Sequence, residues 1–160
     1  MISNQYVTEG VYVEEVAPSN GTSKSPILFI HGGAHGSWTW EKFQPFFAEK
    51  GWRSLALNWF HHYRSDQLPM EVFLKRHLSD IVTEVEIVAK TLDETPIIVG
   101  HSMGGLVAQI YATKHPVKSL VLLAPCAPKS IGRAKVQVDF DLSKPWQAPP
   151  FPVAKQMFFS

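Results

Sequence analysis

The chain has 160 residues, of which 45% are hydrophobic and 18% charged, so it can fold around one core and is not of disordered composition. Its formal net charge is +1 with the two signs well mixed, which gives no indication of a nucleic-acid or anionic-membrane partner. No apolar run approaches the length of a membrane span, the first ten residues lack a signal-peptide core, and Cys126 is the only cysteine. We therefore predict a cytoplasmic protein without an internal disulfide, in which Cys126 is a small, partly buried side chain.

The N-terminal part of the chain predicts two strands and a helix. Residues 11–16 (VYVEEV) alternate between apolar and polar side chains, the pattern of a strand near a sheet edge. Residues 27–30 (ILFI) are continuously apolar, as expected of a strand that is buried on both faces. In residues 38–50 aromatic side chains recur at helical spacing, and Gly51 ends the pattern.

The middle of the chain predicts a strand, a loop and the longest helix. The apolar run RSLALNW (residues 53–59) is the next predicted strand, and residues 60–69 are a predicted loop that contains His61 and His62. Residues 71–91 give the clearest helical pattern, because one apolar stripe steps by three and four positions. The stripe consists of Leu74, Leu78, Ile81, Val85 and Val88.

Two further strands flank the last clear helix. The run PIIV (residues 96–99) precedes a predicted helix over residues 106–115, and SLVLLAP (residues 119–125) follows it. Strands that alternate with helices predict βα units, so the expected fold class is α/β, with a mostly parallel sheet, flanking helices and right-handed crossovers. The proline- and aromatic-rich residues 129–160 show no strand pattern and are predicted to lie outside the core domain, residues 1–128.

The sequence GHSMGG (residues 100–105) lies between a predicted strand and a predicted helix, and it matches the G-x-S-x-G pattern of a serine nucleophile. Such a turn strains the serine backbone and brings the residues two positions before and after it, Gly100 and Gly104, so close together that both must be glycine. The N-terminus of the following helix favours the negative charge that develops in acyl transfer. Ser102 is therefore the predicted nucleophile; the alternative is that the glycines merely form a turn beside an ordinary serine.

A second glycine-rich segment, HGGAHGSW (residues 31–38), follows the predicted strand 27–30. A turn at this place can direct a backbone N–H toward an oxyanion, and we predict Gly33 as one donor and Met103 as the other. An ordinary strand-to-helix turn is the alternative interpretation. Several ring side chains are candidates for the wall of the pocket: His31, His35, Trp38, His62 and His101.

These two motifs resemble the oxyanion loop and nucleophile elbow of the α/β-hydrolase family, in particular its esterases, lactonases and hydroxynitrile-lyase or methylesterase-like members. The resemblance covers about residues 26–128, and it implies Ser102 as the nucleophile with Gly33 and Met103 as oxyanion donors. The implied reaction is acyl transfer to water on a small ester, lactone or thioester, without a metal or organic cofactor. Epoxide-hydrolase and dehalogenase relatives carry aspartate at the elbow, so Ser102 disfavours their chemistry. The resemblance also implies that residues 129–160 begin a cap.

The sequence departs from the family pattern in two places. Many members carry Asp-x-x-Gly-x-Gly-x-Ser in the loop after the second core strand, whereas here Asn58 replaces the aspartate and His61 and Tyr63 replace the glycines. The acid and the histidine of the family's triad follow the nucleophile, on loops after two further strands. The last histidine here is His115, so the usual base is absent from the 160 residues and the core is expected to lack its last two strands.

Turnover by this chain should therefore be slow or absent. Loss of the triad base costs on the order of 10⁶ in kcat and leaves ~10³–10⁴ over water. His35, His61 and His62 are the remaining candidates for a base, whereas His31 is expected to stabilise the oxyanion loop and His101 to point away from the serine. A non-catalytic binding protein derived from a hydrolase is the alternative function.

The predicted strand over residues 119–125 would form an exposed apolar edge of the sheet, because the two strands that follow it in the family are absent. Exposed apolar edges pair readily with other chains. We therefore expect self-association through this strand, in addition to a small ester-like substrate as a partner.

Overall fold

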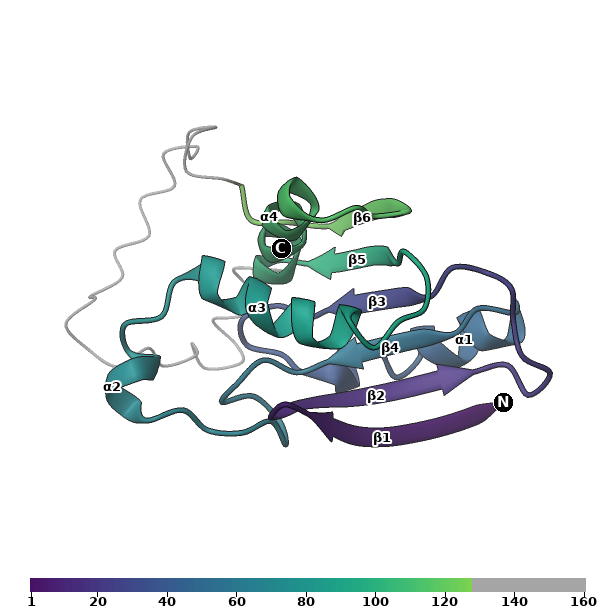
Figure 1. Ribbon diagram of the computed structural model, residues 1–160, viewed down its shortest axis with the longest axis horizontal. Helices are drawn as coiled ribbons and strands as arrows, with labels where there is room; N and C mark the ends of the chain where they lie inside the picture. Colours follow the sequence, from purple (N-terminus) through teal and green to yellow (C-terminus); the bar gives the residue numbers. More distant parts are fainter. Residues whose placement is uncertain (128–160) are drawn as a thin grey trace, which may run out of the picture.

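The computed structural model describes residues 1–127 (Figure 1), so the cap predicted over residues 129–160 lies outside the described residues. Six strands form one sheet in the order β1-β2-β4-β3-β5-β6. The β1–β2 and β2–β4 pairs are antiparallel, and the β3–β4, β3–β5 and β5–β6 pairs are parallel. The predicted α/β class with a mostly parallel sheet is thus confirmed. The strands are β1 (Ile2–Thr8), β2 (Val11–Ala17), β3 (Ile27–Ile30), β4 (Ser54–Leu57), β5 (Ile97–His101) and β6 (Ser119–Leu123).

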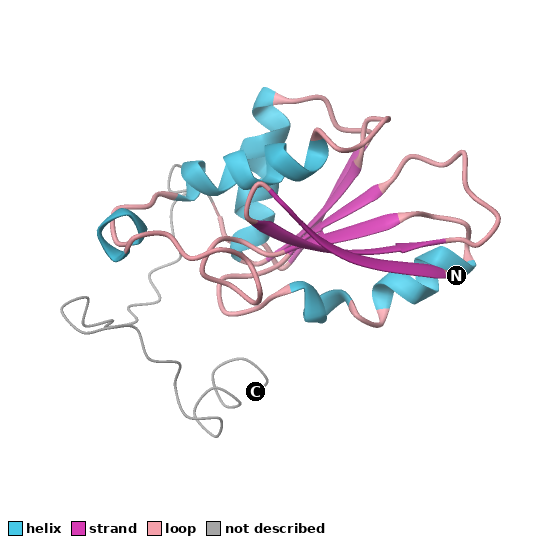
Figure 2. Ribbon diagram, turned by 60° about the horizontal axis from the view of Figure 1, so that its bottom comes forward, coloured by secondary structure: helices cyan, strands magenta, loops and turns pink. Residues whose placement is uncertain are grey.

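Helices cover both faces of this sheet (Figure 2). On one face the strands pack against the buried side chains of α3 and α4, which include Val85 and Val107. On the other face Phe29 stacks on Trp40 with ring centroids 4.6 Å apart, beside α1. The helices are the 3₁₀ helix η1 (Ser37–Trp40), α1 (Phe43–Glu49), α2 (Met70–Phe73), α3 (Leu78–Ala89) and α4 (Met103–Lys114).

The strand β1 was not predicted. It pairs with β2 from Ile2↔Ala17 to Thr8↔Val11, and Glu9 and Gly10 form the turn with φ of +45° and +83°. Most β1 side chains are exposed, so the segment lacks the apolar alternation by which half-buried strands are recognised. The strand predicted near the edge, β2, is consequently second from the edge.

The single helix predicted over residues 71–91 is wrong, because α2 ends at Phe73 and α3 begins only at Leu78. Leu74, which the apolar stripe included, is 75% exposed. His77 is extended at φ −104° and ψ 161°, and its N–H donates to the Asp80 carboxylate at 2.7 Å. This carboxylate satisfies a donor at a new helix start, which apolar periodicity alone does not reveal.

The helix predicted over residues 38–50 is likewise divided into η1 and α1. Pro45 lies in the first turn of α1, where its missing N–H costs no hydrogen bond. An α-helix continuous from η1 would require that N–H as a donor to Glu41, so the chain breaks between the two pieces. Within residues 1–127 no helix is both long and apolar enough to cross a membrane.

Candidate active site

Ser102 lies on the sharp turn between β5 and α4. Its backbone has φ +53° and ψ −121°, and residues other than glycine rarely adopt a positive φ. Its N–H donates to the carbonyl of Leu123 at 3.0 Å, and its carbonyl accepts the N–H groups of Gly105 and Cys126, each at 3.0 Å. The strained residue is therefore held between the end of β6 and the first turn of α4.

The glycines around Ser102 have no space for a side chain. A Cβ on Gly100 would lie 2.6 Å from the carbonyl oxygen of Gly104. A Cβ on Gly104 would lie 2.2 Å from the carbonyl oxygen of His31 and 2.5 Å from that of Ile30. The start of α4 thus packs directly on the backbone at the end of β3, and only glycine permits that approach.

The same contact brings the oxyanion loop against the elbow. A Cβ on Gly32 would lie 3.2 Å from the Cβ of Ser102, and one on Gly33 would lie 2.5 Å from the Sδ of Met103. Met103 opens α4, so its N–H has no acceptor one turn earlier within the helix. The Gly33 N–H donates to no acceptor within residues 1–127. The two predicted oxyanion donors therefore lie on adjacent segments, and neither amide has a backbone acceptor in the part of the chain that the structure describes.

Three of the predicted pocket residues form one row of rings beside Gly32. His35 packs against Trp38 with centroids 5.4 Å apart and against His101 at 5.3 Å, edge to face. The Nδ1 atoms of both histidines are buried without a hydrogen-bond partner in the described part of the chain, and each lies 3.1 Å from the Cβ position of Gly32. Burial, with a smaller contribution from His101, lowers the pKa of His35. Trp38 is 49% exposed at the end of the row.

His31 and His62 belong to a second row, with Trp59. The His31 ring is fully buried and lies 4.4 Å from the Trp59 ring and 5.0 Å from the His62 ring. Its Nδ1 is 2.7 Å from the carbonyl oxygen of Gly32, and its Nε2 accepts the Trp59 N–H at 3.3 Å. These partners fix the tautomer with the proton on Nδ1. Burial lowers the pKa of His31 to about 3, so the ring is neutral.

All seven histidines of the chain lie within residues 1–127, and none is hydrogen bonded to the hydroxyl of Ser102. His61 contacts Leu68 at 2.8 Å, and His115 contacts the Glu86 carboxylate at 2.7 Å. The Oγ of Ser102 lies 3.9 Å from the Sγ of Cys126. The contact of Cys126 with Ser102 was not predicted, and its only sign in the sequence is the position of Cys126 shortly after a strand.

The loop after β4 is built around residues that depart from the family pattern. Asn58 is buried and accepts the Ser37 N–H at 2.8 Å, which holds the start of η1. His61 has φ +65°, at a position where many family members carry glycine. The Phe60 N–H donates to the buried Glu84 carboxylate at 2.7 Å. Glu84 was not predicted as a buried residue, although a charged residue three positions after Ile81, on the buried side of α3, was an available signal.

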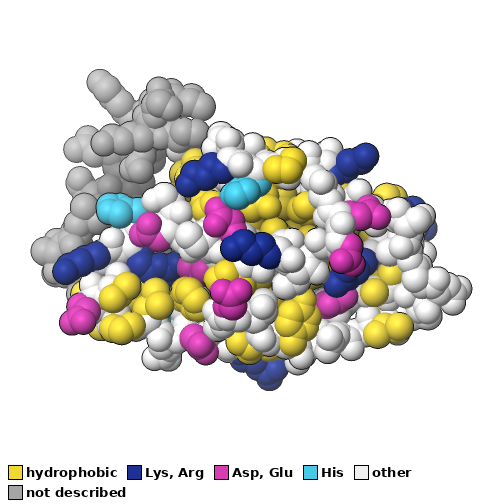
Figure 3. Space-filling view, viewed as in Figure 1, with side chains coloured by type: hydrophobic (Ala, Val, Ile, Leu, Met, Phe, Trp, Pro, Cys, Tyr) yellow, Lys and Arg dark blue, Asp and Glu magenta, His cyan; other side chains and the backbone are white. Residues whose placement is uncertain are grey.

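A cavity of about 560 Å³ lies away from the elbow, between α2 and α3. Apolar and charged side chains line it, among them Phe60, Val72, Lys75, Arg76 and Glu84. Exposed apolar side chains of α2 gather at this end of the molecule (Figure 3). No residue of the elbow or the oxyanion loop lines the cavity, so we place the candidate site by its chemistry and strain rather than by volume. Among residues 1–127 no group of three or more His, Cys, Asp or Glu could hold a metal ion.

Two curated proteins are similar to most of this fold. A putative non-heme haloperoxidase of Mycobacterium phage D29 is 36% identical over 109 residues, which cover 64% of this chain and 37% of that protein. The probable esterase PIR7A of Oryza sativa subsp. indica is 32% identical over 108 residues, 64% of this chain and 39% of that protein. The chain thus spans less than two fifths of the length of these two relatives.

Structural and family comparisons agree with these similarities. A laboratory-evolved variant of potato epoxide hydrolase superposes with a TM-score of 0.65 at 23% identity, over 76% of this chain and 38% of that one, which shows the fold alone. A family model described as alpha/beta hydrolase fold matches residues 25–157. This match covers more than half of the chain, and the chain belongs to the α/β-hydrolase fold family.

Proposed function

We propose that the protein is a serine hydrolase that transfers the acyl group of a small ester, lactone or thioester to water. The observation that carries the proposal is the backbone of Ser102, at φ +53° and ψ −121° on the N-terminus of α4. Such a conformation costs ~1–3 kcal/mol and persists where surrounding structure enforces it, most often at functional sites. The similarity to a probable esterase supports the same reaction class.

In the proposed reaction the Oγ of Ser102 attacks the carbonyl carbon of the substrate and loses its proton to a base. The carbonyl oxygen becomes an oxyanion between the N–H groups of Gly33 and Met103, and the positive end of α4 stabilises it. Collapse expels the alcohol or thiol, which takes up a proton and leaves an acyl-serine. Water then attacks that ester, releases the acid and restores the serine hydroxyl.

The base is the component that the histidines of this chain do not supply, because none is bonded to Ser102. We infer that the 160-residue chain retains only the contribution of the oxyanion hole and of binding, ~10³–10⁴ over the reaction in water. A polypeptide that adds a histidine to Ser102 would raise that rate.

Hydrolysis of p-nitrophenyl esters of increasing acyl length tests the proposed reaction. We expect slow release of p-nitrophenol by the wild-type chain together with an acyl group on Ser102 in its intact mass, and no such acyl group in Ser102→Ala, because that variant has no nucleophile. Ser102→Ala keeps the contribution of the oxyanion hole and of binding, so the acyl-serine rather than the release rate decides. Ser79→Ala, an exposed serine on α3, is the matched control and should be acylated at Ser102 as wild type is. Release by the wild-type chain without an acyl-serine would contradict the proposal.

We also propose that β6 pairs with β6 of a second copy. Among residues 1–127, β6 has a neighbouring strand on one edge only, and Val121 and Leu123 are 40% and 37% exposed. Sedimentation velocity should show a dimer whose fraction rises with concentration, and Val121→Lys should dissociate it because an edge lysine opposes strand pairing. Val7→Lys on the opposite edge strand is the control. A monomer at every concentration would refute the pairing.

A further inference from the structure

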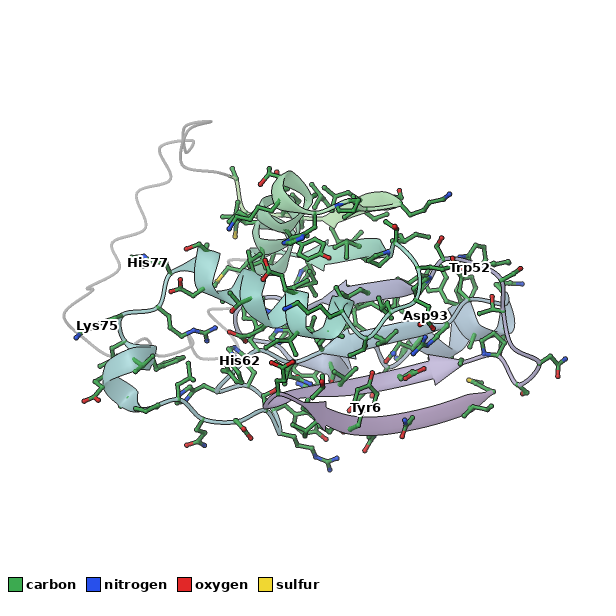
Figure 4. All side chains as sticks on the ribbon, in the orientation of Figure 1. Tyr6, Trp52, His62, Lys75, His77 and Asp93 are labelled. Atoms are coloured by element: carbon green, nitrogen blue, oxygen red, sulfur yellow. The ribbon has the colours of Figure 1, made fainter. Side chains whose placement is uncertain are left out.

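His62 lies in the loop that follows β4, at the end of the sheet where the parallel strands finish (Figure 4). Its Nε2 is 2.9 Å from the carbonyl oxygen of Gly33, and its Nδ1 is 3.1 Å from that of Phe60. Both partners are acceptors, so each contact is a hydrogen bond only when the ring nitrogen in it carries a proton. A neutral imidazole has one N–H, and the shorter contact assigns it to Nε2 and Gly33.

The oxyanion loop receives two further hydrogen bonds next to this one. The carbonyl of Gly32 accepts the Nδ1–H of His31 at 2.7 Å and the backbone N–H of His35 at 3.1 Å. The Gly32 carbonyl and the Gly33 N–H belong to one planar peptide group. The Gly33 carbonyl, which His62 contacts, belongs to the following peptide group. Hydrogen bonds on both peptides therefore fix the backbone on the two sides of Gly33, whose own N–H has no acceptor among residues 1–127.

Two consecutive glycines need such support. Glycine samples a much larger backbone space than other residues, so Gly32 and Gly33 do not define the direction of the Gly33 N–H by themselves. An oxyanion donor acts only when it lies ~2.7–3.1 Å from the developing charge, and small displacements reduce its effect strongly.

His62 is itself held on a rigid base. Its ring packs against His31 and against the buried Trp59, with centroids 5.0 and 5.3 Å apart. The backbone N–H of His62 donates to the Trp59 carbonyl, and the backbone carbonyl of His62 accepts the Ser65 N–H, both at 2.9 Å. A side chain anchored in this way holds the oxyanion loop at a fixed position relative to the loop that follows β4.

We infer that His62 is a positioning residue that orients the Gly33 N–H in the oxyanion hole. The inference rests on the proposed function, because it assigns His62 a role in the same site. Removing the Nε2–H leaves Ser102 and both amides in the chain but frees the peptide that carries the Gly33 carbonyl, so the backbone at Gly33 is restrained on one side only. The loss therefore affects the attack on the carbonyl or phosphoryl group more than the affinity for the unreacted molecule.

The test compares wild type with His62→Leu, His62→Gln and, as a matched control, His77→Leu at an exposed position on the start of α3 (Figure 4). One measurement is the second-order rate of Ser102 labelling by a fluorophosphonate, whose phosphoryl oxygen needs the oxyanion hole. The other is amide hydrogen exchange at His35, whose N–H donates to the Gly32 carbonyl across the turn that contains Gly33, and it requires no chemistry at Ser102. Thermal unfolding of each variant reports global stability separately.

We expect His62→Leu to slow labelling about tenfold, less than the ~10²–10³ for outright loss of a donor, and to speed exchange at His35. His62→Gln should recover most of both, since its side-chain amide places an N–H near the position of Nε2, and His77→Leu should match wild type. Unchanged labelling and exchange in His62→Leu would overturn the inference. If wild-type Ser102 is not labelled at all, the proposed function fails, and exchange at His35 alone then decides whether His62 holds the loop.

Discussion

The Gly104→Ala protein is expected to lose about 3–5 kcal/mol of unfolding free energy or to fail to fold. The added Cβ would meet the carbonyl oxygens of His31 and Ile30 at 2.2 and 2.5 Å. Both are backbone atoms at the end of β3, which is hydrogen bonded to β4 and β5, so neither can move without breaking the sheet. In an ordinary helix the same substitution stabilises the protein by up to ~1 kcal/mol. A loss of unfolding free energy would therefore show that the contact with β3, rather than helix propensity, determines the effect.

Urea unfolding at neutral pH measures this effect. Gly21→Ala is the control, because nothing lies within 4 Å of the added Cβ. Only the backbone strain of alanine at φ +73° then lowers the unfolding free energy, by ~1 kcal/mol. A Gly104→Ala protein as stable as wild type would contradict the close contact between the elbow and β3.

The second large effect is a loss of stability in acid that His31 causes. Above pH 6.5 the imidazole is neutral in the folded and unfolded chains, so it contributes no pH dependence. Below pH 6.5 the unfolded chain takes up a proton that the folded chain refuses until its pKa of about 3. Unfolding free energy should therefore fall by about 1.4 kcal/mol per pH unit across this interval, to a total of at most about 5 kcal/mol.

The measurement is the unfolding free energy of wild type and His31→Asn between pH 7 and pH 4. Carboxylates add their own pH dependence to both proteins, so the difference between the two curves isolates His31. Wild type should have the steeper decline, and His77→Asn, at an exposed position, should follow wild type. Parallel curves for wild type and His31→Asn would show that His31 is protonated in the folded chain.

The sequence predicts the strand-to-helix turns that form the site because glycine spacing reports local backbone geometry. Gly100, Gly104 and Gly33 each lie where a Cβ would meet another atom at 2.6 Å or less. The continuous apolar runs of β3 and β4 predict buried parallel strands for the same local reason: all of their residues are fully buried.

Features that depend on distant partners could not be predicted in this way. His62 and Gly33 are 29 positions apart in the sequence, and no local pattern around either residue predicts the hydrogen bond between them. The buried Glu84 depends on Arg76, with which it forms an ion pair, and on the Phe60 amide. The break before α3 depends on the contact of Asp80 with His77. In the sequence, an aspartate that caps a new helix looks the same as an aspartate on the solvent-exposed face of one continuous helix.

Intact-mass spectrometry with a fluorophosphonate tests most directly whether Ser102 is the nucleophile. We expect one added label on the wild-type chain, located on Ser102 by fragmentation and absent in Ser102→Ala. Fragmentation also excludes Cys126, whose Sγ lies 3.9 Å from the Ser102 hydroxyl. An unlabelled wild-type chain, or a label that persists in Ser102→Ala, would contradict the assignment of Ser102.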